Sequence, residues 1–165
     1  MNMRSSTLTI VIAFAFLLTA TNLRAAGPVS PKKLDALESQ ALEVMKKKAA
    51  ELNISGVAVV SYAEGESIQG WTSKMAVVGR ITDPKASEHG NNLLGIAYAK
   101  SAEMAVTLQD SGTAKRPPMT GEFGWQGGVI LKGKSGYIVV AFSGGKSEDD
   151  VQVSKAGLEV LKKAL

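Results

Sequence analysis

The chain has 165 residues, 45% of them hydrophobic and 21% charged, with no cysteine and one histidine. The lack of cysteine excludes disulfides, thiolate catalysis and cysteine metal sites. Nineteen Lys and Arg stand against fifteen Asp and Glu, but these cations are spread out and are not interleaved with aromatic residues, so nucleic-acid binding is not supported.

Residues 1–26 have the three-part pattern of a secretory signal peptide. Arg4 supplies the positive charge, residues 7–20 form an apolar core, and Leu23-Arg24-Ala25-Ala26 offers a cleavage site. The apolar run is shorter than the roughly twenty residues of a membrane-spanning helix. We therefore expect a periplasmic or secreted protein, with no stable membrane insertion after cleavage and a single domain over residues 27–165.

The first part of that domain is predicted to form a helix followed by two strands. Ser30-Pro31 predicts a helix start, because serine caps a helix and proline suits its first turn, and Asn53 is expected to end the helix. Residues 56–63 are a continuous apolar run typical of a buried central strand, and residues 67–80 form a longer strand region. Gly65 marks the turn between them.

A polar loop and an unusually apolar helix come next. Residues 82–90 contain proline and glycine and are expected to form a loop. An asparagine at 91–92 then caps a helix that runs to about Gln109 and is apolar on most sides, which indicates burial between layers or in a subunit contact. Lys100 lies in its middle, so we expect a partly buried, paired lysine. Residues 110–121 form a second loop.

The C-terminal part predicts a hairpin and a helix. Residues 126–132 and 136–142 are β-rich runs joined by a short glycine-containing turn. After the corner Ser143-Gly144-Gly145, Ser147 is expected to cap the last helix. Its predicted buried face consists of Val151, Ser154, Leu158, Leu161 and Leu165.

The order α-β-β-α-β-β-α, with hairpins in place of parallel crossovers, predicts an α+β fold. We expect an antiparallel sheet of about four to five strands flanked by helices.

Familiar enzyme motifs are missing from the sequence. The sequence does not support a hydrolase with a Ser-His-Asp triad, because His89 is the only histidine and no serine lies in a Gly-x-Ser-x-Gly elbow. Metal sites built on clustered histidines are excluded as well, because the chain has one histidine. No P-loop or dinucleotide fingerprint is present, so a binding protein is favoured over an enzyme.

Several short motifs resemble the GlcG/HbpS haem-degrading domain family. They are Gly127-Gly128, Ser143-Gly144-Gly145, Asp150, Ala156-Gly157-Leu158 and, upstream, Ala99-Lys100-Ser101-Ala102. They occur in the family's order and spacing. The resemblance implies a profilin-like fold, assembly into a homo-oligomer, and an exported protein that binds or handles haem, or its iron, for scavenging, sensing or degradation. If the protein is an enzyme, the resemblance implies that its reaction is the degradation of haem.

On that resemblance, Arg80, His89 and Lys100 are the candidate ligand-binding residues. A neutral imidazole at His89 can serve as an axial haem ligand. Haem propionates can be bound by Arg80, Lys100, Lys115 and Arg116, and an apolar slot can be lined by Trp71, Phe123 and Trp125. An exposed loop histidine and solvated cations are the alternatives.

Glu148, Asp149 and Asp150 are a candidate metal site, because three carboxylates in the first turn of a helix can attract a hard cation or ferric iron. Plain helix capping is the alternative reading. The first hairpin, at Glu64-Gly65, departs from the family pattern. The alternative function is therefore a non-catalytic ligand-binding or assembly module, accessory to a periplasmic enzyme or sensor.

Overall fold

The computed structural model describes residues 29–165. The predicted signal peptide lies outside these residues. The elements are α1 (Pro31–Glu51), β1 (Gly56–Glu64), β2 (Thr72–Val78), β3 (Thr82–Asp83), β4 (Asn91–Asn92), α2 (Leu93–Thr107), β5 (Gly128–Lys132), β6 (Gly136–Ser143), α3 (Ser147–Leu161) and a final 3₁₀ turn (Lys162–Ala164).

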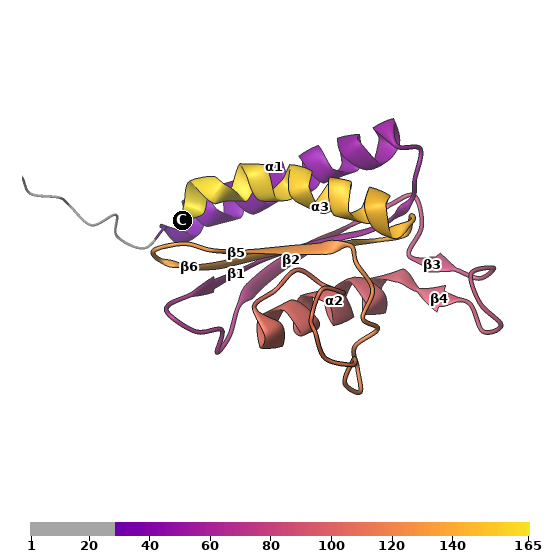
Figure 1. The fold of residues 1–165 in the computed structure, drawn as a ribbon. Helices are drawn as coiled ribbons and strands as arrows, with labels where there is room; N and C mark the ends of the chain where they lie inside the picture. Colours follow the sequence, from indigo (N-terminus) through magenta and orange to yellow (C-terminus); the bar gives the residue numbers. More distant parts are fainter. Residues whose placement is uncertain (1–28) are drawn as a thin grey trace, which may run out of the picture.

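A four-stranded antiparallel sheet in the order β2-β1-β6-β5 forms the centre of the fold. Helices α1 and α3 cover one face of this sheet, and α2 covers the other (Figure 1). The predicted α+β class and the predicted antiparallel sheet with flanking helices are confirmed. The two central strands, β1 and β6, come from the two predicted hairpins and pair with each other along Val57–Glu64 and Gly136–Ser143.

Both central strands are apolar on their two faces because helices cover the sheet on both sides. Every residue of β6 is buried, and in β1 only Glu64 is exposed. The larger core cluster lies between the sheet and the α1–α3 layer, where Met45 and Phe142 are fully buried. A side chain at Gly157 would place its Cβ 2.6 Å from the Sδ of Met45. Glycine at this position therefore allows α1 and α3 to pack closely.

Two of the three predicted helix starts have the expected cap. The Ser30 hydroxyl accepts from the Lys33 amide at 3.4 Å, and the Asn92 side chain accepts from the Gly95 amide at 3.0 Å. Asn53 has a φ of 54° just beyond α1, as expected of a residue that ends a helix. The predicted Ser147 cap is wrong. Ser147 is the first residue of α3, and Lys146 precedes it without a side-chain capping bond.

The predicted buried face of α3 is also partly wrong. The buried residues are Asp150, Val153, Ser154, Gly157, Val160 and Leu161, whereas Val151 and Leu158 are half-buried. Asp150 is buried because it pairs with Lys100, and it joins Ser154, which donates to the Gly127 carbonyl oxygen, on the buried face.

The loop predicted over residues 82–90 includes strand β3 and leads into β4, and these two short strands form a hairpin that we call the arm. The arm extends away from the sheet and the helices (Figure 1). The strand region predicted over residues 67–80 is shorter in the structure, as β2 covers only Thr72–Val78. Within residues 29–165, no helix has both the length and the hydrophobicity required to cross a membrane.

Candidate functional site

A buried ion pair joins three elements at one end of the sheet. The Nζ of Lys100, from α2, lies 2.8 Å from Oδ2 of Asp150, which lies in the first turn of α3. The same ammonium donates to the carbonyl oxygen of Phe142 in β6 at 2.7 Å. Both residues are 3% exposed. The expectation that Lys100 is buried and paired is therefore confirmed.

Gly127 is required by this ion pair. Its φ is +134°, and a Cβ at this position would lie 2.2 Å from the Nζ of Lys100. Its carbonyl oxygen accepts from the Ser154 hydroxyl at 2.7 Å and from the Phe142 amide at 3.0 Å. Gly127 thus allows Lys100 to reach Asp150 and also links β6 to α3.

Burial acts on the two ionic groups in opposite directions. Desolvation raises the pKa of Asp150 and lowers the pKa of Lys100, and in each case the attraction of the partner opposes this effect. The Gly145 amide donates to Oδ1 of Asp150 at 2.8 Å. The Ser143-Gly144-Gly145 corner therefore supports the carboxylate through its backbone.

A small polar pocket opens beside the ion pair, and we call it the polar pit. Its volume is about 130 Å³. Its lining includes both members of the ion pair and the polar side chains of Asp83, Asn91, Gln126, Ser143 and Ser147. An ammonium group has three N–H donors, and Lys100 uses two of them on Phe142 and Asp150. No acceptor for the third is found among the described residues.

Arg80 contacts two residues that line the polar pit. Its guanidinium is 2.9 Å from Oδ2 of Asp83 and donates to the carbonyl oxygen of Gly144 at 3.1 Å. Its side chain is 44% exposed. The structure thus brings Arg80 and Lys100 to the same end of the sheet, with Arg80 at the surface and Lys100 beneath it.

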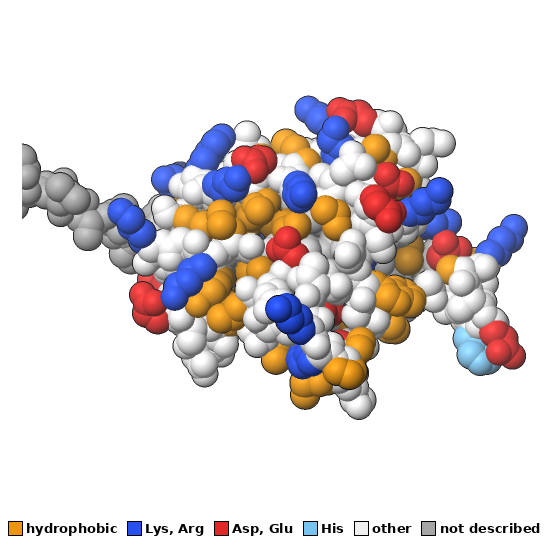
Figure 2. All heavy atoms as spheres, viewed as in Figure 1, with side chains coloured by type: hydrophobic (Ala, Val, Ile, Leu, Met, Phe, Trp, Pro, Cys, Tyr) orange, Lys and Arg blue, Asp and Glu red, His pale blue; other side chains and the backbone are white. Residues whose placement is uncertain are grey.

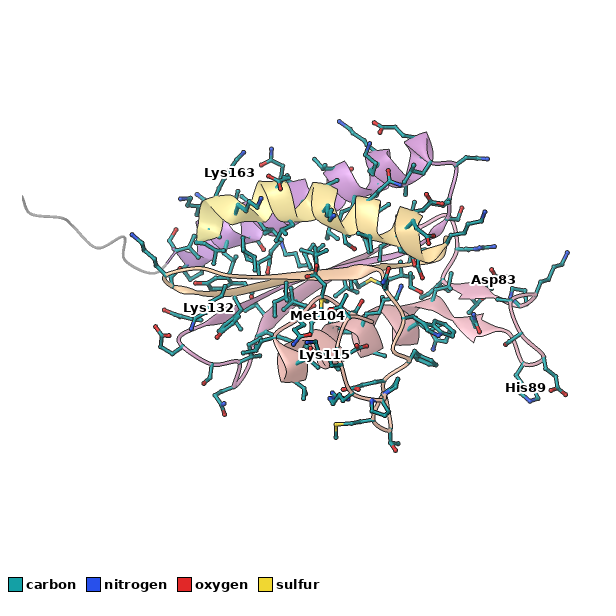
Figure 3. All side chains as sticks on the ribbon, in the orientation of Figure 1. Asp83, His89, Met104, Lys115, Lys132 and Lys163 are labelled. Atoms are coloured by element: carbon teal, nitrogen blue, oxygen red, sulfur yellow. The ribbon has the colours of Figure 1, made fainter. Side chains whose placement is uncertain are left out.

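His89 is not part of this cluster. Figure 3 shows Asp83 at the end of β3 and His89 at the tip of the arm, directed away from the sheet. The space-filling view shows the same histidine clear of the main body of the molecule (Figure 2). His89 is exposed.

The three carboxylates at the start of α3 have different environments. Glu148 is exposed, Asp149 is half-buried and Asp150 is buried against Lys100. Among the described residues, no three His, Cys, Asp or Glu side chains are grouped in a way that could hold a metal ion.

A second pocket, which we call the arm groove, lies between the arm and the loop that follows α2. Its volume is about 330 Å³, and it is lined by Gly90, Asn91, Asn92, Gly95, Ile96, Ala99, Gly121 and Phe123. The Phe123 and Trp125 rings pack against each other with centroids 4.9 Å apart, and each residue is 46% exposed. Phe123 and the residues Gly95, Ile96 and Ala99 of α2 give the groove an apolar side.

Other predicted cations and aromatics lie elsewhere. Arg116 makes two 2.7 Å hydrogen bonds to Glu122, so its guanidinium already has a carboxylate partner. Trp71 lines a different groove, near Leu34 and Tyr62. Trp71 precedes β2 and Arg80 follows it, so Trp71 lies at the opposite end of this strand.

Sequence reasoning missed two parts of the site. The pairing of Asp150 with Lys100 was missed because a carboxylate in the first turn of a helix already has an explanation in capping. The arm was missed because its strands are two residues each, too short to show an alternating pattern.

Comparisons with known proteins include a remote structural likeness. No protein-family model matches the chain, and no curated protein matches it. A crystal structure of a double mutant of HbpS from Streptomyces reticuli is similar to this chain with a TM-score of 0.44 and 18% sequence identity. The match covers 94% of this chain and 99% of that one.

Proposed function

We propose that this protein is an exported haem-binding protein that holds haem in the arm groove. The observation that carries the proposal is the arm groove itself, an apolar space bounded by Phe123 and by the arm that bears the chain's only histidine. Its volume of about 330 Å³ lies within the usual range for pockets that bind organic ligands. Membership of the GlcG/HbpS family and a role in haem or iron scavenging, storage or sensing belong to the same proposal.

Haem fits the arm groove better than the polar pit. The pit has a volume of about 130 Å³ and a mostly polar lining, which is too small and too polar for a porphyrin. In the arm groove, Ile96 and Ala99 offer an apolar floor and Phe123 a wall. When bound, haem would supply an iron atom that accepts a nitrogen ligand.

His89 and Arg80 have separate tasks in this proposal. The neutral imidazole of His89 would ligate the iron once the tip of the arm turns towards Phe123. Arg80 is partly exposed and paired with Asp83 of the arm, and its guanidinium would bind a propionate through the N–H donors that Asp83 and Gly144 do not use. Lys100 does not take part, because its ammonium is buried and bonded to Asp150 and Phe142.

Titration of the purified protein with hemin tests the proposal. We expect a stoichiometric shift of the Soret band that is altered in His89→Ala and weakened at least tenfold in affinity in Phe123→Ala. Trp71→Phe is the matched control, since Trp71 lies at the other end of β2, and should bind as the native protein does. Light scattering of the same samples measures whether the protein forms the homo-oligomer that we also propose.

A hemin titration without a Soret shift would reject the haem proposal. The same holds if Trp71→Phe is weakened as much as Phe123→Ala, because hemin would then bind without preference for the arm groove.

The polar pit supports a second candidate function, a module that binds a small polar molecule without haem. The supporting observation is that Lys100 lines the pit together with Asn91, Gln126 and Ser143. Such a module could serve as an accessory subunit of a periplasmic enzyme or sensor. A thermal-shift screen of small polar compounds tests it, because a true ligand should lose its effect in Gln126→Leu.

A further inference from the structure

Helix α2 carries its charges on the side that faces the protein. Lys100 and Glu103 are its only charged residues, and each of them is 3% exposed. A surface helix of a globular protein normally has the reverse arrangement, with apolar residues towards the core and charged residues towards water. Because a helix that is apolar all round is normally buried, we expect the outer face of α2 to be covered by another protein surface.

That outer face is an uncharged line of residues, which we call the α2 seam. It consists of Gly95, Ala99, Ala102 and Val106, of which only Ala99 is half-buried and the others are exposed. Spacings of four, three and four residues place them on one side of the helix. The other two helices, α1 and α3, lie on the opposite face of the sheet (Figure 1). The seam is therefore not covered by another helix of residues 29–165.

The α2 seam is complementary in shape to itself when a second copy runs antiparallel. With a two-fold axis between Ala99 and Ala102, Val106 of each copy faces Gly95 of the other, and Ala99 faces Ala102. Val106 is 66% exposed, whereas Gly95 has no side chain and lines the arm groove. The largest side chain of the seam thus meets the smallest residue. The two alanines at the centre allow the helix axes to approach to about 8 Å.

The charges of α2 favour the same antiparallel arrangement. Its first turn has no acidic residue and its last turn has no basic residue, so neither end of the helix dipole is compensated by a side chain of the helix itself. In an antiparallel pair, the positive end of one α2 lies beside the negative end of the other, whereas a parallel pair brings like ends together. The seam itself brings no like charges into contact, because it has none.

The size of the contact sets its strength. Helix α2 has 15 residues, so the seam is about 22 Å long, and a helix is about 10 Å wide. A strip of this size is well below the roughly 800 Å² per partner of a stable interface. Phe123 is 46% exposed and lines the groove that the partner's Val106 would enter, so it enlarges the contact. We therefore expect a dimer that forms and dissociates with protein concentration.

We propose that two copies of this protein form an antiparallel dimer through the α2 seam, each placing Val106 in the arm groove of the other. This inference rests on the homo-oligomer of the proposed function, for which it names the interface, and it does not depend on haem. Because Gly95 and Ala99 line the arm groove, the second copy and haem exclude each other there. The dimer is thus the haem-free form.

Analytical ultracentrifugation of the haem-free protein, at concentrations over about three orders of magnitude, tests the proposal. We expect a monomer–dimer equilibrium in the native protein. Ala102→Glu and Ala102→Lys should each raise the dissociation constant of the dimer at least about tenfold, because like charges then meet near the two-fold axis. A mixture of the two variants should associate again, because the charges are then opposite. Ala36→Glu is the matched control, because Ala36 is an exposed alanine of α1, and it should dimerise as the native protein does.

Amide NMR spectra of the native protein at high and low concentration give a second readout that needs no variant. The proposal predicts that dilution shifts the amides of residues 95–106 and of Phe123 most. A native protein that stays monomeric at every concentration would reject both the homo-oligomer and this interface. A dimer whose dilution shifts lie elsewhere, or that persists unchanged in folded Ala102→Glu, would reject the interface and leave the homo-oligomer in place.

Discussion

At the scale of single residues, the Lys100–Asp150 pair is the strongest constraint on the site. Both charges are almost fully removed from water, and each depends on the other and on one backbone group, Phe142 for the lysine and Gly145 for the aspartate. A buried pair of this kind adds little net stability compared with apolar residues, but removing one partner leaves the other charge uncompensated. The pair therefore matters more for the arrangement of α2, β6 and α3 than for the total stability.

We predict that Lys100→Met lowers the free energy of unfolding by about 3–5 kcal/mol at pH 7, because Asp150 is left buried without its cation. Burial already raises the pKa of Asp150 above its ordinary value, and loss of Lys100 raises it further. A carboxyl group whose pKa is raised by folding stabilises the folded state at low pH and loses this effect as the pH rises through that pKa. The deficit should thus shrink between pH 7 and pH 5, as measured by urea denaturation.

The double variant Lys100→Met/Asp150→Asn is the control for this prediction. It removes both charges and retains an acceptor for the Gly145 amide, so it should recover part of the lost stability and respond less to pH than the single variant. A deficit in Lys100→Met that is the same at pH 5 and pH 7 would contradict a buried, uncompensated Asp150.

Lys100 shows how far sequence reasoning extends at this scale. Its burial and pairing could be predicted, because the helix around it is apolar on most sides and a charge inside such a helix needs a partner. The identity of the partner could not. Asp150 is fifty positions away, and only the packing of α3 against β6 brings the two residues together.

At the scale of elements, α2 and α3 begin in different ways. Asn92 caps α2 with its side chain, whereas α3 has no side-chain cap and depends on Asp150, in its first turn, which accepts from the Gly145 amide. The sequence predicted both caps, since asparagine and serine are equally good capping residues. It could not reveal that α3 begins at Ser147, because that boundary depends on the inward turn of Asp150.

We predict that Asn92→Ala destabilises the protein by about 1 kcal/mol, the usual cost of losing a helix cap. Ser147→Ala should change stability by less than about 0.5 kcal/mol, because its hydroxyl makes no capping bond. Thermal or chemical denaturation of the two variants side by side measures the difference. Equal losses would mean that Ser147 caps α3 in solution.

At the scale of the whole molecule, the two hairpins of the sheet could be predicted and their arrangement could not. Because strands that follow each other in the chain usually pair, β1 is expected to pair with β2 and β5 with β6. The pairing of β1 with β6 joins residues about eighty positions apart and leaves no local signal. The continuous apolar character of residues 56–63 and 136–142 indicated only that both strands are central.

This arrangement predicts a gradient of stability from the middle of the sheet to the arm. Strands β1 and β6 are bonded on both sides and buried between two helical layers, so their amides should exchange only when the whole molecule unfolds. The arm has two residue pairs in its ladder and exposed residues at its tip. Its amides should exchange through local opening.

Native-state hydrogen exchange followed by NMR should give protection factors in β6 at least about 100-fold higher than in residues 84–90. The edge strand β2 provides an internal reference and should lie between the two. Equal protection of the arm and β6 in the free protein would contradict the prediction and would mean that the arm is covered by a second copy or by the protein's own ligand.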